Sequence, residues 1–194
     1  MKINQTDLAY LTALISGDGT VTKYYIRISD KHKKNLQYIK LLLKNNNIKS
    51  YLKREKPRKF ILEINSRKFI EYLDIMFGIK QGIKKKIIIP KNNLTLFKIK
   101  KAYMQGWFDA EGYIENWKKP KTKKIYLRVH FGCKNRNVVL WLKKELERLN
   151  MKVSKVWFNS KTYRFQIGQQ ESVNAFLKII GFRYPTKTVF SRTV

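Results

Sequence analysis

Two short segments, LTALISGDG (Leu11–Gly19) and MQGWFDAEG (Met104–Gly112), decide how this chain of 194 residues folds. In both, a helix-like apolar run ends in a small residue, an acid and a glycine, and a strand-like segment follows. The two acids, Asp18 and Glu111, are 111 − 18 = 93 residues apart, close to half the chain. A repeat at this distance predicts a pseudo-dimer that brings two carboxylates together.

Small residues recur every four positions in both helix-like runs. The first run has Ala9, Ala13 and Gly17, and the second has Ala102, Gly106 and Ala110. Residues four apart lie on one stripe of a helix, and a stripe of small side chains lets two helices approach closely. We therefore expect the two helices to pack side by side with their C-terminal ends adjacent. The alternative is two separate helix ends.

The charge of the chain is strongly positive. Lys and Arg number 43 against 13 Asp and Glu, a formal net charge of +30, and 11 Tyr, 11 Phe and 4 Trp are interleaved with them. This composition favours a folded protein that binds a polyanion, above all nucleic acid. A membrane surface is the other candidate, but no apolar run approaches the ~18 residues that span a bilayer, and no signal-peptide pattern is present.

The cysteine and histidine content limits two other classes. A single cysteine, Cys133, rules out an internal disulfide framework and fits a reducing compartment. With only Cys133, His32 and His130 as soft or imidazole ligands, a zinc site is not expected.

Hydrophobic periodicity divides the chain into two passes of similar order, a repeated αββαββα pattern of the α+β class. In the first pass we expect helices at Asp7–Gly17, Lys33–Asn46 and Arg67–Phe77, and strands at Val21–Ser29, Lys49–Glu55 and Lys59–Asn65. In the second we expect helices at Leu96–Ala110, Asn137–Asn150 and Ser172–Ile180, and strands at Tyr113–Trp117, Ile125–Phe131, Lys152–Phe158 and Tyr163–Gly168. The predicted organisation is an N-terminal half (1–79), a linker (80–95) and a C-terminal half (96–194).

The position of the two acids suggests a metal site. A carboxylate at a helix C-terminus is disfavoured by the helix dipole, and two carboxylates held together repel each other. A divalent cation relieves both effects, and Mg²⁺ commonly takes one or two carboxylates together with phosphate oxygens. We therefore predict that Asp18 and Glu111 bind Mg²⁺ and act in phosphodiester hydrolysis. The simpler alternative is that both acids only precede turns. Asp109 is expected to be structural, because its counterpart in the first copy is Ser16.

The two acid-ended segments and the repeat that covers nearly the whole chain resemble a single-chain, two-motif LAGLIDADG homing endonuclease. The resemblance implies two four-stranded antiparallel sheets that form a DNA-binding saddle, with the two motif helices packed at its centre. It also implies Mg²⁺-dependent double-strand cleavage across the minor groove with 3′ overhangs, with Mn²⁺ as a substitute. The carbonyls of Gly17 and Ala110 would be further metal ligands. The expected enzyme is a monomer that cuts a long asymmetric site in double-stranded DNA.

The resemblance also implies a basic residue near the end of the second strand of each half, which helps to organise the attacking water. The matching positions are Lys31 and Lys134. An ordinary surface position is the alternative, since the chain has 43 basic residues.

Strand alternation predicts which side chains face the DNA. A β-ribbon fits the major groove, where Arg pairs with guanine and Gln with adenine. The predicted DNA-binding residues of the first half are Tyr25, Arg27, Ser29, Lys53, Lys59, Ile61, Glu63 and Asn65. Those of the second half are Lys124, Tyr126, Arg128, His130, Lys155, Trp157, Arg164 and Gln166.

Three other functions remain open. The same fold could act as an RNA maturase that assists splicing of an intron RNA, or as a DNA-binding regulator that does not cleave. A general basic RNA binder would need neither the paired stripes nor the paired acids. We expect an intracellular protein, in a prokaryotic cytoplasm or in an organelle, and the composition does not distinguish these compartments.

Overall fold

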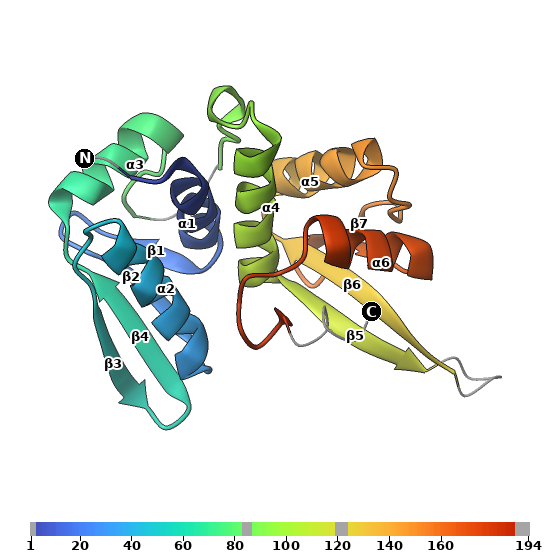
Figure 1. The fold of residues 1–194 in the computed structure, drawn as a ribbon, viewed down its shortest axis with the longest axis horizontal. Helices are drawn as coiled ribbons and strands as arrows, with labels where there is room; N and C mark the ends of the chain where they lie inside the picture. Colours follow the sequence, from blue (N-terminus) through green and yellow to red (C-terminus); the bar gives the residue numbers. More distant parts are fainter. Residues whose placement is uncertain (1–2, 83–86, 119–123, 189–194) are drawn as a thin grey trace.

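The computed structural model describes residues 3–82, 87–118 and 124–188. It contains two halves with the same order of elements, each built on a four-stranded antiparallel sheet (Figure 1). The first half comprises α1 (Gln5–Asp18), β1 (Gly19–Val21), β2 (Ile26–Asp30), α2 (Lys33–Asn45), β3 (Tyr51–Lys56), β4 (Lys59–Ile64) and α3 (Arg67–Phe77). A short 3-10 helix, η1 (Lys91–Asn93), precedes the second half. The second half comprises α4 (Phe97–Glu111), β5 (Gly112–Lys118), β6 (Ile125–Cys133), α5 (Arg136–Arg148), β7 (Trp157–Asn159), β8 (Thr162–Ile167) and α6 (Gln170–Ile179).

The strand order repeats as well. It is β1-β2-β4-β3 in one sheet and β5-β6-β8-β7 in the other. The two sheets lie on either side of a central pair of helices, α1 and α4 (Figure 1). The predicted α+β fold, with its pseudo-twofold repeat, is therefore confirmed.

Helices α1 and α4 pack together through their small residues. A β-carbon added at Gly106 would lie 2.3 Å from the carbonyl oxygen of Tyr10 and 2.8 Å from the β-carbon of Ala13. One added at Gly17 would lie 2.5 Å from the β-carbon of Ala110. Only a hydrogen fits at these glycines, so the stripes are what allows the two backbones to approach.

Each sheet buries one face and leaves the other accessible. Helix α2 packs on the first sheet, and α5 and α6 pack on the second (Figure 1). In β6, Val129, Phe131 and Cys133 are buried, whereas the alternating residues Arg128 and His130 are partly exposed. This alternation places polar side chains on the face opposite the covering helices.

Two predicted strands differ from the structure. The single strand predicted at Val21–Ser29 is divided into β1 and β2 by a turn. There the Thr22 N–H donates to the Tyr25 carbonyl at 2.9 Å, and the Tyr25 N–H donates to the Thr22 hydroxyl oxygen at 3.0 Å. A threonine side chain that bonds the backbone locally stabilises a turn within a sequence of strand-like composition.

The strand predicted at Lys152–Phe158 forms only from Trp157, as β7. Before it, the Gln166 N–H donates to the hydroxyl oxygen of Ser154 at 2.9 Å, while the Ser154 N–H donates to the Gln166 carbonyl at 2.9 Å. The serine side chain thus takes the place of a backbone carbonyl, and the regular ladder is interrupted.

The segment that follows α6 returns to the central helices. It runs from the end of α6 across α4 and down toward the C-terminal end of α4 (Figure 1). Within the described ranges, none of the helices combines the length and apolar composition that crossing a bilayer requires.

Candidate active site

The two acids are the last residues of the two central helices. Asp18 ends α1, and Gly19 caps the helix by donating its N–H to the Ile15 carbonyl. Glu111 ends α4, and the N–H of Gly112 donates to the Phe108 carbonyl. Both acids therefore lie where the negative ends of two helix dipoles meet.

The close approach of the helices brings the two motifs together across the halves. A β-carbon at Gly17 of α1 would lie 3.4 Å from the γ-carbon of Glu111 of α4. Asp18 and Ala110 in turn line one common pocket. Each acid is thus placed beside the residue that precedes the acid of the other half, as a twofold arrangement requires.

One pocket of about 400 Å³ lies at the end of the first motif. Asp18, Lys31 and Asp30 of the first half line it together with Ala110 of the second. Asp30 is held in place because its carboxylate accepts a hydrogen bond from the His32 N–H at 2.7 Å. The predicted residues Asp18, Lys31 and Ala110 therefore share one site.

A second pocket of about 310 Å³ has the corresponding composition. Its lining includes Glu111, Cys133 and Lys134 of the second half and Gly17 of the first. Burial raises the pKa of the Cys133 thiol to about 12, with Glu111 adding to the rise. Cys133 is therefore a protonated, buried thiol, and Lys134 is the basic side chain of this pocket.

Asp109 has a different role from its neighbour Glu111. Its side chain is buried, and one carboxylate oxygen accepts hydrogen bonds from the Tyr10 hydroxyl at 2.8 Å and from the N–H groups of Arg183 and Tyr184, both at 3.0 Å. Burial raises the pKa of Asp109 to about 6, against the lowering effect of Lys187 and of these hydrogen bonds. It anchors the C-terminal segment to the helix pair.

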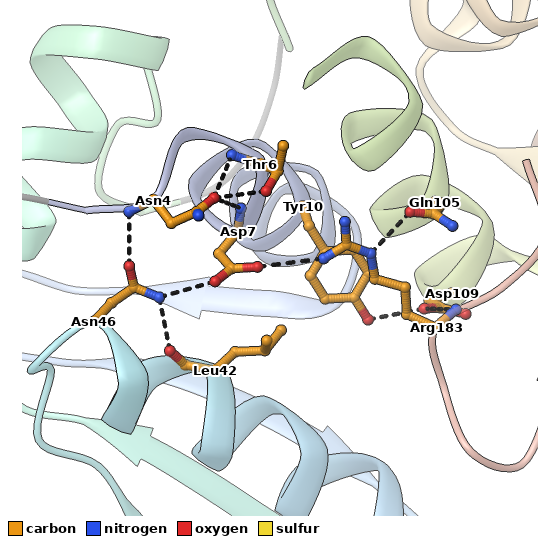
Figure 2. A network of polar contacts seen from close by, with 9 residues as sticks. All are labelled: Asn4, Thr6, Asp7, Tyr10, Leu42, Asn46, Gln105, Asp109 and Arg183. Carbon is orange, nitrogen blue, oxygen red and sulfur yellow. Dashed lines mark hydrogen bonds and ion pairs between the residues drawn. The ribbon is translucent and has the colours of Figure 1, made fainter. Parts of the chain in front are cut away.

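Figure 2 shows the wider network around this anchor. The guanidinium of Arg183 donates to Gln105 of α4 at 2.8 Å and lies 3.4 Å from the carboxylate of Asp7 in α1. Asn46 in turn donates to Asp7 at 3.1 Å. Polar contacts therefore tie the C-terminal segment to both halves beside the central helices.

The donor set at the helix ends suits a hard divalent cation. Carboxylates of Asp18 and Glu111 and backbone carbonyls at helix C-termini are oxygen ligands of the kind that Mg²⁺ and Ca²⁺ take. Among the residues that the structure describes, no three His, Cys, Asp or Glu side chains gather into a protein-only metal cage. A cation held by these two carboxylates and two carbonyls would complete its shell with water and substrate oxygens.

The accessible faces of the sheets carry most of the predicted DNA-binding residues. Arg27 pairs with Glu63 at 2.9 Å, and Lys53 lies 3.5 Å from the same carboxylate. The Arg27 guanidinium holds the pKa of Glu63 below its usual value. Exposed or partly exposed positions also include Tyr25, Ser29, Lys59, Asn65, Lys124, Tyr126, Arg128, His130, Lys155, Trp157, Arg164 and Gln166.

Ile61 is an exception to the predicted exposure. Ile61 lies on the outward face as predicted, but it is only 1% exposed, so the expectation that it is accessible is wrong. Ile61 lies in the inner strand β4, opposite Ser29 on one side and Lys53 on the other. Side chains that are opposite in a ladder share one face, and on this face the neighbouring side chains cover the isoleucine.

Strand β5 adds residues that the sequence analysis missed. Tyr113 stacks on His130 with ring centroids 4.7 Å apart, and the guanidinium of Arg128 lies 3.7 Å from the centroid of Trp117. Both aromatic residues pair in register with β6, so they extend the same face. Alternation within the predicted strand Tyr113–Trp117 was the signal that could have identified them.

Comparison with known proteins gives the same two-part organisation. A family model described as a LAGLIDADG-like domain matches residues 5–95 and, a second time, residues 98–181. No curated protein sequence matches the chain.

Several solved structures share the fold. I-DmoI in complex with DNA and Mn has 20% sequence identity and a TM-score of 0.63, over 92% of this chain and 98% of that one. I-DmoI in complex with DNA and Ca has 18% identity and a TM-score of 0.67, over 97% and 98% of the two chains. The N-terminal LAGLIDADG domain of DUF199/WhiA has 14% identity and a TM-score of 0.64, over 98% and 87%. These TM-scores establish the common fold.

Proposed function

The chain belongs to the LAGLIDADG-like domain family, and on that premise we propose that it is a site-specific homing endonuclease. It makes a double-strand break in a long asymmetric DNA site, by hydrolysis of one phosphodiester bond in each strand, and leaves 3′ overhangs. The observation that carries this proposal is the crossed arrangement of the two pockets. In each pocket, an acid of one half lies with the residue that precedes the acid of the other half.

The similar structures support a nuclease of this kind. I-DmoI is described as a homing endonuclease, and its structures contain target DNA in the presence of Mg, or DNA with Mn. The present chain matches nearly the whole length of I-DmoI, so both halves are present. DUF199/WhiA has the same fold, and the functional choice therefore depends on the residues of the site.

Mg²⁺ is the proposed cofactor, with Mn²⁺ as a substitute. Asp18 and Glu111 supply carboxylate ligands, and Gly17 and Ala110 supply their backbone carbonyls. When bound, the cation activates water and stabilises the leaving oxygen of a phosphodiester. The protein contributes the alignment, because the contact between α1 and α4 sets how far apart the two acids lie.

Lys31 and Lys134 are the proposed basic residues of the two pockets. Each lies beyond the end of the second strand of its half and lines the pocket that holds the acid of that half. An ammonium there orients the attacking water and offsets the charge that develops on the phosphate.

DNA binding is assigned to the accessible faces of the two sheets. The net charge of +30 supplies affinity for the phosphate backbone, and the outward side chains of the strands read bases. The outward residues differ at equivalent positions of the two halves, as with Arg27 in β2 against His130 in β6, so a single chain recognises an asymmetric site as a monomer.

The test is cleavage of a randomised duplex library by the purified protein. We expect cut molecules that share one long sequence in the presence of Mg²⁺ or Mn²⁺, and none with a chelator. Asp18→Asn and Glu111→Gln are expected to abolish cleavage while leaving DNA affinity within about threefold, because a lost ligand stops chemistry without removing a phosphate contact. Asp74→Asn, an exposed acid of α3, is the matched control for the change in charge. Wild-type cleavage by Asp18→Asn would refute the assignment.

The lysines have a separate test. Lys31→Met and Lys134→Met are expected to slow turnover by about 10²-fold, the scale of a lost general acid–base or orienting group, with a smaller change in affinity. Lys68→Met, at an exposed position of α3, is the control. A loss of affinity with normal turnover would identify both lysines as phosphate contacts.

The same purified proteins distinguish two alternative functions, a maturase and a non-cleaving DNA-binding regulator. Tight binding to a structured intron RNA without DNA cleavage would favour a maturase. Sequence-specific duplex binding without cleavage, unaffected by Asp18→Asn, would favour a DNA-binding regulator. The presence of an acid in both motifs favours the nuclease over each of them.

A further inference from the structure

The segment after α6 is anchored to both halves of the molecule. The N–H groups of Arg183 and Tyr184 both donate to the carboxylate of Asp109 in α4, at 3.0 Å. The N–H and hydroxyl of Thr186 donate to the side-chain oxygen of Asn35 in α2, at 3.3 and 3.0 Å. These contacts hold the next residue, Lys187, at a defined place between the two halves.

The ammonium of Lys187 lies at the C-terminal end of α4. It donates hydrogen bonds to the carbonyls of Asp109 at 2.6 Å, Gly112 at 2.7 Å and Phe108 at 3.1 Å. An ammonium has three donors, so these three carbonyls account for all of them. A positive charge at this end of a helix is favourable because it opposes the helix dipole.

The three acceptors flank the candidate metal ligands. Phe108 and Asp109 precede Ala110 and Glu111, and Gly112 follows them. Lys187 therefore fixes the last turn of α4 on both sides of the proposed ligands, and the Ala110 carbonyl is not one of its three acceptors.

Lys187 also lies in the electrostatic field of the acids. It lines the pocket that contains Asp18, Lys31 and Ala110. Burial lowers its pKa, whereas the nearby acids, with Asp109 and Asp18 foremost, oppose that change. The ammonium is therefore a built-in positive charge beside the site proposed for a divalent cation.

We propose that Lys187 is a positioning residue of the candidate active site, which holds the Ala110 carbonyl and the Glu111 carboxylate in place and offsets the acids when no metal is bound. This inference rests on the proposed function, because it assigns Lys187 to the same site. It predicts two opposite consequences of removing the ammonium. A divalent cation binds more tightly because one repelling charge is gone, while turnover falls because the last turn of α4 is no longer fixed.

The test combines metal binding with turnover. For Lys187→Met, calorimetric titration with Ca²⁺ is expected to show roughly three- to tenfold tighter binding, the effect of one unit charge that the neighbouring acids and solvent partly screen. Cleavage of the selected target with Mg²⁺ is expected to fall about 10- to 100-fold, because small displacements of ligands are costly. Lys178→Met, at an exposed position of α6, is the matched control and should change neither quantity.

Two further variants separate charge from hydrogen bonding. Lys187→Gln keeps two N–H donors but no charge, so its Ca²⁺ affinity should rise as in Lys187→Met while it retains more of the turnover. Lys187→Arg keeps the charge, so its Ca²⁺ affinity should stay near wild type, while its planar fork fits the converging carbonyls less well and slows turnover. If Lys187→Met does not fold, Lys187→Gln decides the question.

The outcomes distinguish this inference from the proposed function. Unchanged or weaker Ca²⁺ binding by a folded Lys187→Met or Lys187→Gln variant overturns the role of Lys187. If the wild type binds Ca²⁺ and Asp18→Asn does not, but the wild type cuts no DNA, the nuclease assignment is overturned. The role of Lys187 is then judged from the Ca²⁺ affinities of its own variants. If the wild type binds no Ca²⁺, the role of Lys187 is overturned whether or not DNA is cut.

Discussion

Replacing Gly106 by alanine tests whether the contact between α1 and α4 sets the geometry of the active site. The new β-carbon would lie 2.3 Å from the Tyr10 carbonyl oxygen, 2.8 Å from the Ala13 β-carbon and 3.1 Å from the Leu14 nitrogen. Two of these three atoms belong to the backbone of α1, so a side-chain rotation cannot relieve the overlap. Extending 2.3 Å to the 3.4 Å of an ordinary contact moves the helices apart by about 1 Å at this point.

Two opposing effects set the change in stability. Alanine in a helix is favoured over glycine by about 1 kcal/mol, whereas overpacking a tight contact costs about 1–3 kcal/mol. Because the overlap involves backbone atoms, we expect the upper end of that cost and a net destabilisation of about 1–2 kcal/mol. For a chain of this size this corresponds to a fall in Tm of roughly 2–8 °C. A displacement of this size between the acids is expected to reduce cleavage by about 10²-fold.

Urea unfolding followed by circular dichroism measures the first effect, and single-turnover cleavage measures the second. Gly168→Ala is the control, because a β-carbon there would meet nothing within 4 Å, and a surface change of this kind should stay within about 0.5 kcal/mol. A Gly106→Ala variant that is as stable as the wild type and cleaves at the same rate would refute the reasoning.

Three other changes probe separate parts of the structure. Tyr10→Phe removes the hydroxyl that donates to Asp109 at 2.8 Å, and because this acceptor is buried and charged we expect a loss of about 1.5–3 kcal/mol in the free energy of unfolding. Burial raises the pKa of the Cys133 thiol, so iodoacetamide should label the native protein much more slowly at pH 8 than the urea-unfolded protein. Equal rates in the two states would contradict this. Glu63→Gln releases Arg27 from its 2.9 Å ion pair, so binding to non-specific duplex DNA should tighten and the slope of log affinity against log salt should steepen by up to about one unit; a weaker binder would show that Glu63 is needed to orient its partner.

The sequence predicted the features that depend on regular spacing. The small residues of α1 and α4 recur at the helical period, and the buried Val129 and Phe131 of β6 alternate with the exposed side. Both patterns arise from the geometry of a single element, so they are visible without knowledge of the partner element. Asp18 and Glu111 could be predicted for the same reason, because each directly follows one of the recurring small residues.

The predictions that were wrong, and the features that were not predicted, depend on contacts that local spacing in the sequence does not encode. Ile61 alternates as an outward residue and is nevertheless buried, because its exposure depends on the neighbours that β2 and β3 place beside it. The turn at Thr22 and the interrupted ladder at Ser154 result from side-chain hydrogen bonds to the backbone. Such bonds compete with strand pairing in segments whose composition is that of a strand.

The sequence by itself determined the two halves, the helices that join them and the two acids, because repeats and periodicities are properties of the chain read in order. The tertiary structure alone decided that Lys187 also lies at the end of α4. Lys187 reaches the carbonyl of Asp109 from 78 positions away along the chain, and a lysine among 43 basic residues carries no local signal of that contact. Its place depends on where the segment after α6 is anchored, which is settled only when both halves have packed against the central helices.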